Sequence, residues 1–303
     1  MTQEKLHLQV WQDPINKLAA HMGCQRTHTM DICYKFRDVS SSLWNEANYA
    51  HRQGETFHEE TLTQRLIFLL KRKLRGTGIY LNSISRSKEA QDGGDWEWVF
   101  VRNNEAIKMR LQAKRLYPSA KYEKLHYKNQ TEALIKSCSS DGYMPLYCFY
   151  NFDPPIAPIE PRIFTCHHDY RLPSYWGCCV ADARGILTLG STNDFGAVHP
   201  LTMPFHRLVC NYNQNLLEAV ENNYSKIPIM IRDGEYSELG QERTVPIIRD
   251  SIPHHISKML NLYRTELFIG DGQEREKRVD EIKHEIFDDR QGVSRITVFH
   301  DRY

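Results

Sequence analysis

The stretch that decides the fold runs from Gly93 to Tyr117 and reads GGDWEWVFVRNNEAIKMRLQAKRLY. It predicts two short antiparallel strands that are joined by a tight connection at Asn103-Asn104. Successive side chains of a strand point to opposite faces of its sheet. In the second strand, Gln112 and Lys114 therefore share one face, and the apolar residues that alternate with them share the other face.

Three polar side chains mark one end of this predicted hairpin. Asp95 opens the first strand, and Gln112 and Lys114 close the second. An acid beside a Q-x-K sequence on a neighbouring strand is an arrangement that can hold a divalent metal and a lysine against a phosphodiester. The hairpin alone supplies one carboxylate, so this chemistry needs an acid from another element.

Length and composition are those of an ordinary soluble globular protein. The chain has 303 residues and a mass of 35.6 kDa, which is enough for one elaborated domain or two ordinary ones. No apolar run approaches the ~18 residues that cross a bilayer, and we expect no secretion signal. The 8 cysteines are irregularly spaced. We therefore expect mostly buried, reduced thiols and a cytoplasmic location.

Charge is unevenly distributed along the chain. The net charge is only +1, but residues 60–128 hold 15 Lys and Arg against 7 Asp and Glu, a net charge of +8. The rest of the chain therefore carries −7. The basic segment is the one that holds the Q-x-K sequence, so it is where a polyanion would bind, unless it is merely a solvated basic surface.

The strongest predicted helix lies in the sequence FHEETLTQRLIFLLKRKLRG, which ends at Gly76. Its leucines form an apolar stripe, and basic residues gather near its C-terminal end. On a helical wheel the stripe centres on the direction of Glu59, with Glu60 roughly 100° away. A carboxylate on a buried face is costly unless something pairs with it or binds to it. Glu59 is therefore either a buried acid that faces a site or a solvated acid that favours the helix dipole.

The remaining patterns of the N-terminal half complete a recognisable order of elements. Apolar spacing predicts a helix over 30–51, a strand over 79–85, a second amphipathic helix over 122–138 and a buried central strand over 144–152. A proline-rich run to Pro161 then marks a boundary. An N-terminal extension over 1–27 precedes a core over 28–155. After the helix over 30–51, this core has the order helix, strand, strand, strand, helix, strand.

Residues 156–303 carry weaker signals. They predict strands over 175–183, 185–190, 204–210 and 294–303, and helices over 216–223, 252–267 and 274–287. We expect a C-terminal α+β region, which is either a second domain or an elaboration of the first sheet.

The predicted order and its polar residues resemble those of a known nuclease superfamily. An αβββαβ core with Glu on the first helix, Asp on the second strand and (D/E/Q)-x-K on the third is typical of the PD-(D/E)XK, or restriction-endonuclease-like, superfamily. The sequence GGD...RLQAKRL is most similar to its Q-x-K branch, as in Mrr-like nucleases. HEETLT, QAKRL, NQTEALI and PLYCFYN also resemble an uncharacterised bacterial restriction-endonuclease-like family. The resemblance covers residues 28–152.

The resemblance implies roles for individual residues. Glu59 or Glu60, Asp95 and Gln112 would hold Mg²⁺ or Mn²⁺, and Lys114 would be the catalytic lysine. Carboxylate and carbonyl oxygens suit such ions, and the ion and the lysine together would activate water and neutralise the phosphate. Gln112 departs from the commoner Glu or Asp, and a neutral ligand binds Mg²⁺ less strongly.

We therefore expect an α/β protein with a restriction-endonuclease-like core around a mixed four-stranded sheet. The implied function is metal-dependent endonuclease cleavage of DNA, in bacterial restriction or anti-phage defence, with a homodimer or a defence protein as possible partner and no membrane association. Two alternatives keep the fold. One is an inactive nucleic-acid-binding or regulatory subunit, and the other is an RNase that uses the same residues.

Two further groups of residues allow competing interpretations. Glu97 shares a face with Asp95 and is either an auxiliary metal ligand or, more simply, a surface glutamate. Cys166, His167 and His168 together with Cys178-Cys179 suggest zinc, although their spacing matches no usual structural zinc site. Buried thiols are the simpler interpretation of these cysteines.

Overall fold

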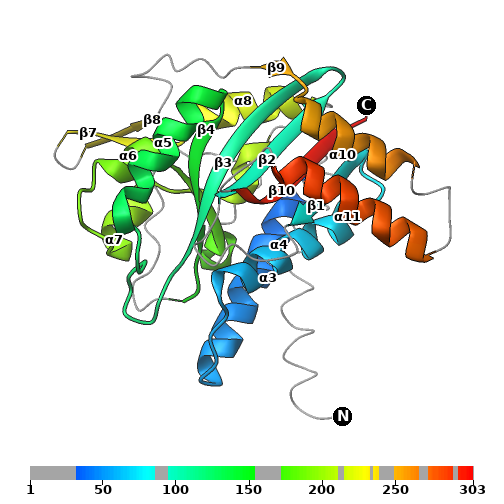
Figure 1. Cartoon of the computed structure of the whole chain (residues 1–303). Helices are drawn as coiled ribbons and strands as arrows, with labels where there is room; N and C mark the ends of the chain where they lie inside the picture. Colours follow the sequence, from blue (N-terminus) through cyan, green and yellow to red (C-terminus); the bar gives the residue numbers. More distant parts are fainter. Residues whose placement is uncertain are drawn as a thin grey trace, which may run out of the picture. The chain divides into compact units, whose positions relative to one another are not determined.

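A mixed sheet of eight strands organises the described part of the chain (Figure 1). The computed structural model describes residues 32–85, 95–153, 172–210, 215–232, 235–238, 249–265, 272–288 and 293–302. The strands lie in the order β1-β10-β2-β3-β4-β5-β6, and β9 pairs with β3 outside this path. Their bounds are β1 Ile79–Ser85, β2 Asp95–Arg102, β3 Glu105–Arg115, β4 Met144–Tyr150, β5 Cys178–Asp182, β6 Met203–Pro204, β9 Asp250–Ser251 and β10 Val293–Asp301.

This sheet contains both parallel and antiparallel pairs of neighbouring strands. β10 runs parallel to β2, and β3 runs parallel to β4. The pairs β1–β10, β2–β3, β4–β5 and β5–β6 are antiparallel. A separate two-stranded sheet joins β7 (Pro228–Arg232) and β8 (Glu235–Glu238). The predicted α/β class with a mixed central sheet is confirmed.

The predicted hairpin is β2 and β3. Arg102 pairs with Glu105 across the turn, and Asn103 adopts φ 54° there, a left-handed conformation that asparagine tolerates better than most residues. The register continues to the pair Trp96–Leu111 at the other end of the hairpin. Both apolar side chains are buried, so one face of the hairpin is committed to the core.

Helices cover both faces of the sheet (Figure 1). One face packs on α3 and α4, with Phe36, Leu66 and Trp98 in a shared core. The other face packs on α5 and α6 beside β4 and β5, and on α10 and α11 beside β1, β2 and β10. The helix bounds are α3 Ile32–Arg52, α4 Glu59–Lys73, α5 Gln130–Asp141, α6 Ala183–Leu187, α7 Phe195–Val198, α8 Leu216–Tyr224, α10 His254–Thr265 and α11 Gly272–Asp288; the 3-10 turns are η1 Tyr127–Asn129, η2 Pro173–Trp176, η3 His199–Leu201 and η4 Phe205–Val209.

Helix α4 forms where its apolar stripe predicts it. Leu62, Leu66, Leu69 and Leu70 are buried along one side, and burial of each such side chain contributes about 1.5–3 kcal/mol. Gly76 follows the helix with φ +76°, a conformation that side chains with a Cβ rarely adopt. None of the described helices is both long and apolar enough to cross a membrane.

Strand β10 corrects the expected four-stranded sheet. It comes from the C-terminal part of the chain and lies between β1 and β2, so these two strands do not pair with each other. The sheet therefore joins residues from both sides of the predicted boundary near residue 155. The N-terminal extension over 1–27 lies outside the described residues.

Three predicted elements differ from the observed ones. The helix predicted from residue 122 begins only at Gln130, because Lys128 and Asn129 adopt left-handed conformations. Residues 185–190, predicted as a strand, instead form the end of α6 and a turn, and Asp182 caps that helix by accepting a hydrogen bond from the Arg184 N–H. Residues 204–210 form the turn η4 after a two-residue strand.

Candidate functional site

Lys114 lies near the end of β3 with its side chain almost enclosed. The residue is 8% exposed, and its Nζ donates a hydrogen bond to Oε1 of Gln130 at 3.4 Å. Gln130 is the first residue of α5. Burial lowers the pKa of Lys114; the negative charge of Glu59 opposes this shift, and the positive charge of Lys124 adds to it. A lysine with a lowered pKa exchanges a proton more easily near neutral pH than an ordinary lysine does.

Glu59 faces the same end of β3 from the first residue of α4. Its Oε1 accepts a hydrogen bond from the backbone N–H of Arg115 at 3.2 Å. Burial raises the pKa of Glu59, whereas the charge of Lys114, the hydrogen bond from the Arg115 N–H and the charge of Arg115 act in the opposite direction. The next residue, Glu60, is exposed. The structure therefore brings Glu59 to Lys114, and it leaves Glu60 in solvent.

Gln112 and Asp95 lie at the same end of the hairpin. Gln112 is half-buried, and it shares a face of β3 with Lys114 because the two residues are two apart in a strand. Asp95 begins β2, where its backbone pairs with Val293 of β10. The β2–β3 register ends with Trp96 opposite Leu111, so Asp95 is one step further, at the level of Gln112. The side chain of Asp95 lies outside the described part of the structure.

The oxygen donors at this end suit a hard divalent cation. The carboxylate of Glu59 and the amide oxygen of Gln112 are ligand types that Mg²⁺ and Mn²⁺ accept. Within the described side chains, which do not include that of Asp95, no group of three His, Cys, Asp or Glu is placed to hold a metal. The donor set is therefore chemically suitable, and its third acid would be Asp95.

The zinc interpretation has little support among the described residues. Cys178 and Cys179 are fully buried in β5, and burial raises the pKa of both thiols well above the usual range. A thiol must lose its proton to bind zinc. Cys166, His167 and His168 lie outside the described residues.

Comparison with known proteins places the chain in a family. Residues 32–300 match a family that is described as "Family of unknown function (DUF6615)". The chain belongs to the DUF6615 family. No curated protein and no solved structure matches it. The match covers all the strands of the sheet except the last residue of β10, so the fold and the candidate site are both features of the matched region.

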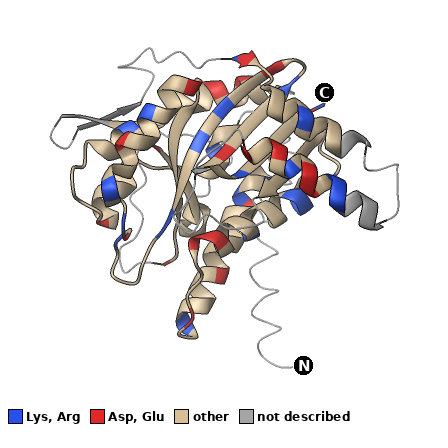
Figure 2. Cartoon of the chain, viewed as in Figure 1, with Lys and Arg blue, Asp and Glu red and all other residues tan. Residues whose placement is uncertain are grey.

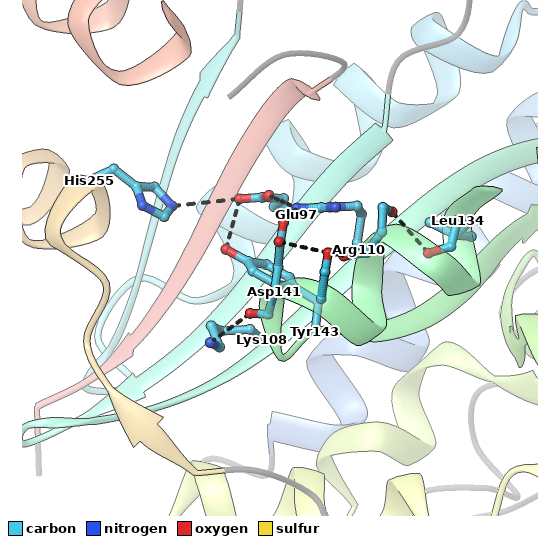
Figure 3. A network of polar contacts seen from close by, with 9 residues as sticks. Glu97, Lys108, Arg110, Leu134, Asp141, Tyr143 and His255 are labelled. Carbon is cyan, nitrogen blue, oxygen red and sulfur yellow. Dashed lines mark hydrogen bonds and ion pairs between the residues drawn. The ribbon is translucent and has the colours of Figure 1, made fainter. Parts of the chain in front are cut away.

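A buried polar network lies further along the same face of the hairpin, and sequence reasoning did not find it (Figure 3). Glu97 is completely buried. Its Oε1 accepts a hydrogen bond from Arg110 at 3.1 Å, and its Oε2 accepts one from Tyr143 at 3.2 Å. Arg110 also donates to Asp141 at 2.9 Å, and His255 Nε2 lies 3.7 Å from Glu97. The interpretation of Glu97 as a surface glutamate is therefore wrong.

This network uses both carboxylate oxygens of Glu97 for contacts within the protein. The side chain joins β2 to β3 and to Tyr143, the residue before β4, and it lies close to α10. A buried carboxylate that is bonded to a buried guanidinium supports the position of the hairpin. Glu97 therefore has a structural role next to the candidate site, and the positive charge of Arg110 compensates its negative charge.

Positive charge extends along β3 beyond the candidate site. Figure 2, which has the same view as Figure 1, shows basic positions recurring along this strand. They are Lys108, Arg110, Lys114 and Arg115. Lys108 is held by Asp250 at 2.7 Å, and Arg110 is held by two carboxylates. Of these four basic residues, Lys114 and Arg115 have no ion pair among the described residues, and both lie at the end of the strand where Glu59 is.

Proposed function

We propose that this protein is a metal-dependent endonuclease that hydrolyses phosphodiester bonds in DNA. One observation carries the proposal. Lys114, almost enclosed at the end of β3, shares its surroundings with Glu59, and each has the pKa shift that burial causes. Fold stability alone gives no reason to bury a lysine and a glutamate without a direct ion pair, whereas functional sites accept this cost.

The order of elements supports the same proposal. Helix α4 is followed by β1, β2 and β3, then by α5 and β4, which is the αβββαβ order of restriction-endonuclease-like nucleases. The first helix supplies Glu59, the second strand begins with Asp95, and the third carries Gln112 and Lys114. In this proposal, strand β10, which lies between β1 and β2, is an addition to that arrangement.

The residues of the candidate site would have two roles, metal binding and contact with the phosphate. Glu59, Asp95 and the amide oxygen of Gln112 would hold Mg²⁺ or Mn²⁺, which when bound polarises the phosphate and activates water. Among the described residues, only Gln130 accepts a hydrogen bond from Lys114, so its other N–H groups can donate to the phosphate oxygens. Enclosure of the ammonium strengthens that interaction, because the local dielectric is lower than in water.

A plasmid-cleavage assay tests the proposal. Purified protein incubated with supercoiled plasmid and Mg²⁺ or Mn²⁺ should produce nicked or linear DNA, and Lys114→Ala should lose this activity. Lys136→Ala is the matched control, because Lys136 is an exposed lysine of α5. Equal cleavage by Lys114→Ala and the wild type would show that the site is wrongly assigned. Intact plasmid with both metals would remove DNA cleavage, and a structured RNA would then be the substrate to test.

A second candidate function follows from Gln112. A neutral amide stands where most nucleases of this kind have a carboxylate, and it binds Mg²⁺ less strongly. A subunit that binds nucleic acid without cleaving it would keep the same fold and the basic residues of β3. It would bind DNA in EDTA with an affinity that falls steeply with salt, and Gln112→Ala would not affect it. A role in bacterial restriction or anti-phage defence is part of our proposal for either activity.

A further inference from the structure

Arg115, the last residue of β3, is a buried cation to which the described part of the chain offers no hydrogen-bond acceptor. The residue is 9% exposed, and its guanidinium carbon lies 3.7 Å from the centre of the Tyr117 ring. Among the described residues, no oxygen accepts a hydrogen bond from the guanidinium. The backbone N–H of Arg115 does donate, to Glu59, but the side chain makes no ion pair.

Two other arginines of this fold, the buried Arg110 and the partly buried Arg184, have carboxylate partners. Arg110 lies 3.1 Å from Glu97 and 2.9 Å from Asp141. Arg184 makes an ion pair with Asp182 at 2.5 Å. Removing a charge from water is costly unless another group compensates it. Arg110 and Arg184 have this compensation from hydrogen-bonded carboxylates. Within the described residues, Arg115 has only the charge of Glu59 nearby, without a hydrogen bond from its guanidinium to that carboxylate.

The Arg115 side chain lies on the opposite face of the sheet from Lys114, because successive strand residues alternate. It lines a cavity of about 30 Å³ between α3, the start of α4 and the ends of β3 and β4. One water needs roughly 10–15 Å³ on this scale, so the cavity has room for a small group beside the guanidinium. Its other walls include Leu43, His51, Phe57, Leu62 and Phe152.

The polar side chains that line the cavity do not accept hydrogen bonds from the Arg115 guanidinium. Asn151 also lines it, but its amide donates to the carbonyl of Trp176 at 2.8 Å and its oxygen accepts from Tyr122 at 2.6 Å. Glu55 is at the exposed rim, where water screens its charge. The cavity therefore offers an anion one enclosed guanidinium among mainly apolar walls, and guanidinium binds phosphate oxygens in bidentate fashion.

We infer that Arg115 binds a phosphate group of the nucleic-acid substrate, at a subsite separate from the one that Lys114 and Glu59 form. This inference rests on the proposed function for the source of the phosphate. The two sites meet at Glu59, whose Oε1 accepts the Arg115 N–H and whose charge acts on Lys114. A strand that passes around the end of β3 can place different phosphates on its two faces.

The experiment measures binding without cleavage. Wild type, Arg115→Gln and Arg115→Lys are titrated against a fluorescent single-stranded oligonucleotide in EDTA at several chloride concentrations. Thermal melts with and without inorganic phosphate, at constant ionic strength, form a second arm. Arg278→Gln is the control, because it removes the same charge from an exposed position of α11. Circular dichroism spectra confirm that each variant is folded.

The expected results identify the subsite. Arg115→Gln should weaken oligonucleotide binding by about tenfold and reduce the salt slope by ~0.7, the value of one phosphate contact to a single strand. Phosphate should raise the melting temperature of the wild type but not that of Arg115→Gln. Arg115→Lys should fall between the two, because lysine keeps the charge and loses the bidentate geometry. Arg278→Gln should match the wild type in both arms.

Three other results overturn all or part of the inference. If Arg115→Gln binds the oligonucleotide with the affinity and salt slope of the wild type, Arg115 contacts no substrate phosphate. If the wild type responds to phosphate through Arg115 but binds no oligonucleotide, the subsite is an anion site and the nucleic-acid function fails. If neither ligand has an effect on the wild type, both the subsite and the nucleic-acid function are wrong.

Discussion

Replacing Lys114 with methionine should make the protein more stable and remove most of its proposed activity. Methionine has nearly the length of the lysine stem, so the apolar packing of the side chain is kept. The ammonium it removes is in a residue that is only 8% exposed. Burial lowers the pKa of Lys114 in the folded state. Below that lowered pKa the unfolded state holds the charge more favourably, so the charge costs stability at neutral pH.

The size of the gain follows from two opposing terms. The substitution loses one hydrogen bond to Gln130, at the long distance of 3.4 Å, and such bonds contribute about 0.5–1.5 kcal/mol. Gln130 is half-buried, so water can replace the lost donor. Exchanging buried ionic groups for apolar ones of similar volume stabilises proteins by about 1–4 kcal/mol. We expect a net gain of about 1–2 kcal/mol, or roughly 2–8 °C in melting temperature.

Thermal unfolding and plasmid cleavage, measured on the same preparations, test this expectation. Cleavage by Lys114→Met should fall by about 10²–10³, the usual effect of removing one donor to a transition-state oxyanion. The exposed Lys136→Met should change neither quantity. A melting temperature below that of the wild type would show that the Lys114 side chain stabilises the folded state. The argument that it is buried for function would then be refuted.

The remaining predictions concern the packing and charge around the site. Gly177→Ala should destabilise the protein by about 1–3 kcal/mol or more, because a Cβ there would lie 2.1 Å from the Ser40 carbonyl oxygen; an unchanged urea midpoint would contradict this. Glu97→Ala should cost about 3–5 kcal/mol, since it removes one of the two carboxylates that hold Arg110, and chemical denaturation measures the loss. Glu59→Gln should stabilise the protein at neutral pH, because burial raises the pKa of Glu59 above 4.5 and the ionised form is the one that burial disfavours. That advantage should vanish as the pH falls through the raised pKa towards 4.5, and melts over this range that show a constant difference would contradict the assignment.

The sequence predicted those helices and strands whose side chains alternate between apolar and polar with a regular period. Alternation and helical spacing placed β1 at Ile79–Ser85, where the structure has it, and α4 within two or three residues. The start of α5 was predicted eight residues too early, because the apolar spacing continues through a turn that Lys128 and Asn129 form in left-handed conformations. Such backbone conformations leave no periodic signal in side-chain polarity.

The insertion of β10 could not be predicted for a different reason. Residues 294–303 were expected to form a strand, and β10 occupies nearly this range. The choice of its partners depends on packing across the whole sheet, where Phe299 stacks on Phe100 with ring centres 4.7 Å apart. The residues of β10 and β2 are about two hundred positions apart in the chain, and no local pattern records which strands pair at such a separation.

The two arginines of β3 show where prediction of the site from sequence must stop. Arg110 and Arg115 are both buried residues of one strand. Composition and spacing do not distinguish a structural role from a ligand-binding role for either of them. Arg110 is compensated by Asp141, which is 31 positions away at the end of α5. Arg115 lies on the other face, where the described elements supply a cavity with mainly apolar walls and no carboxylate that accepts a hydrogen bond from its guanidinium; Glu59 accepts from its backbone N–H instead. Whether a buried cation is structural or faces a ligand is thus decided by what other elements bring to it. Lys114 could be proposed from its motif, whereas Arg115 required the tertiary structure.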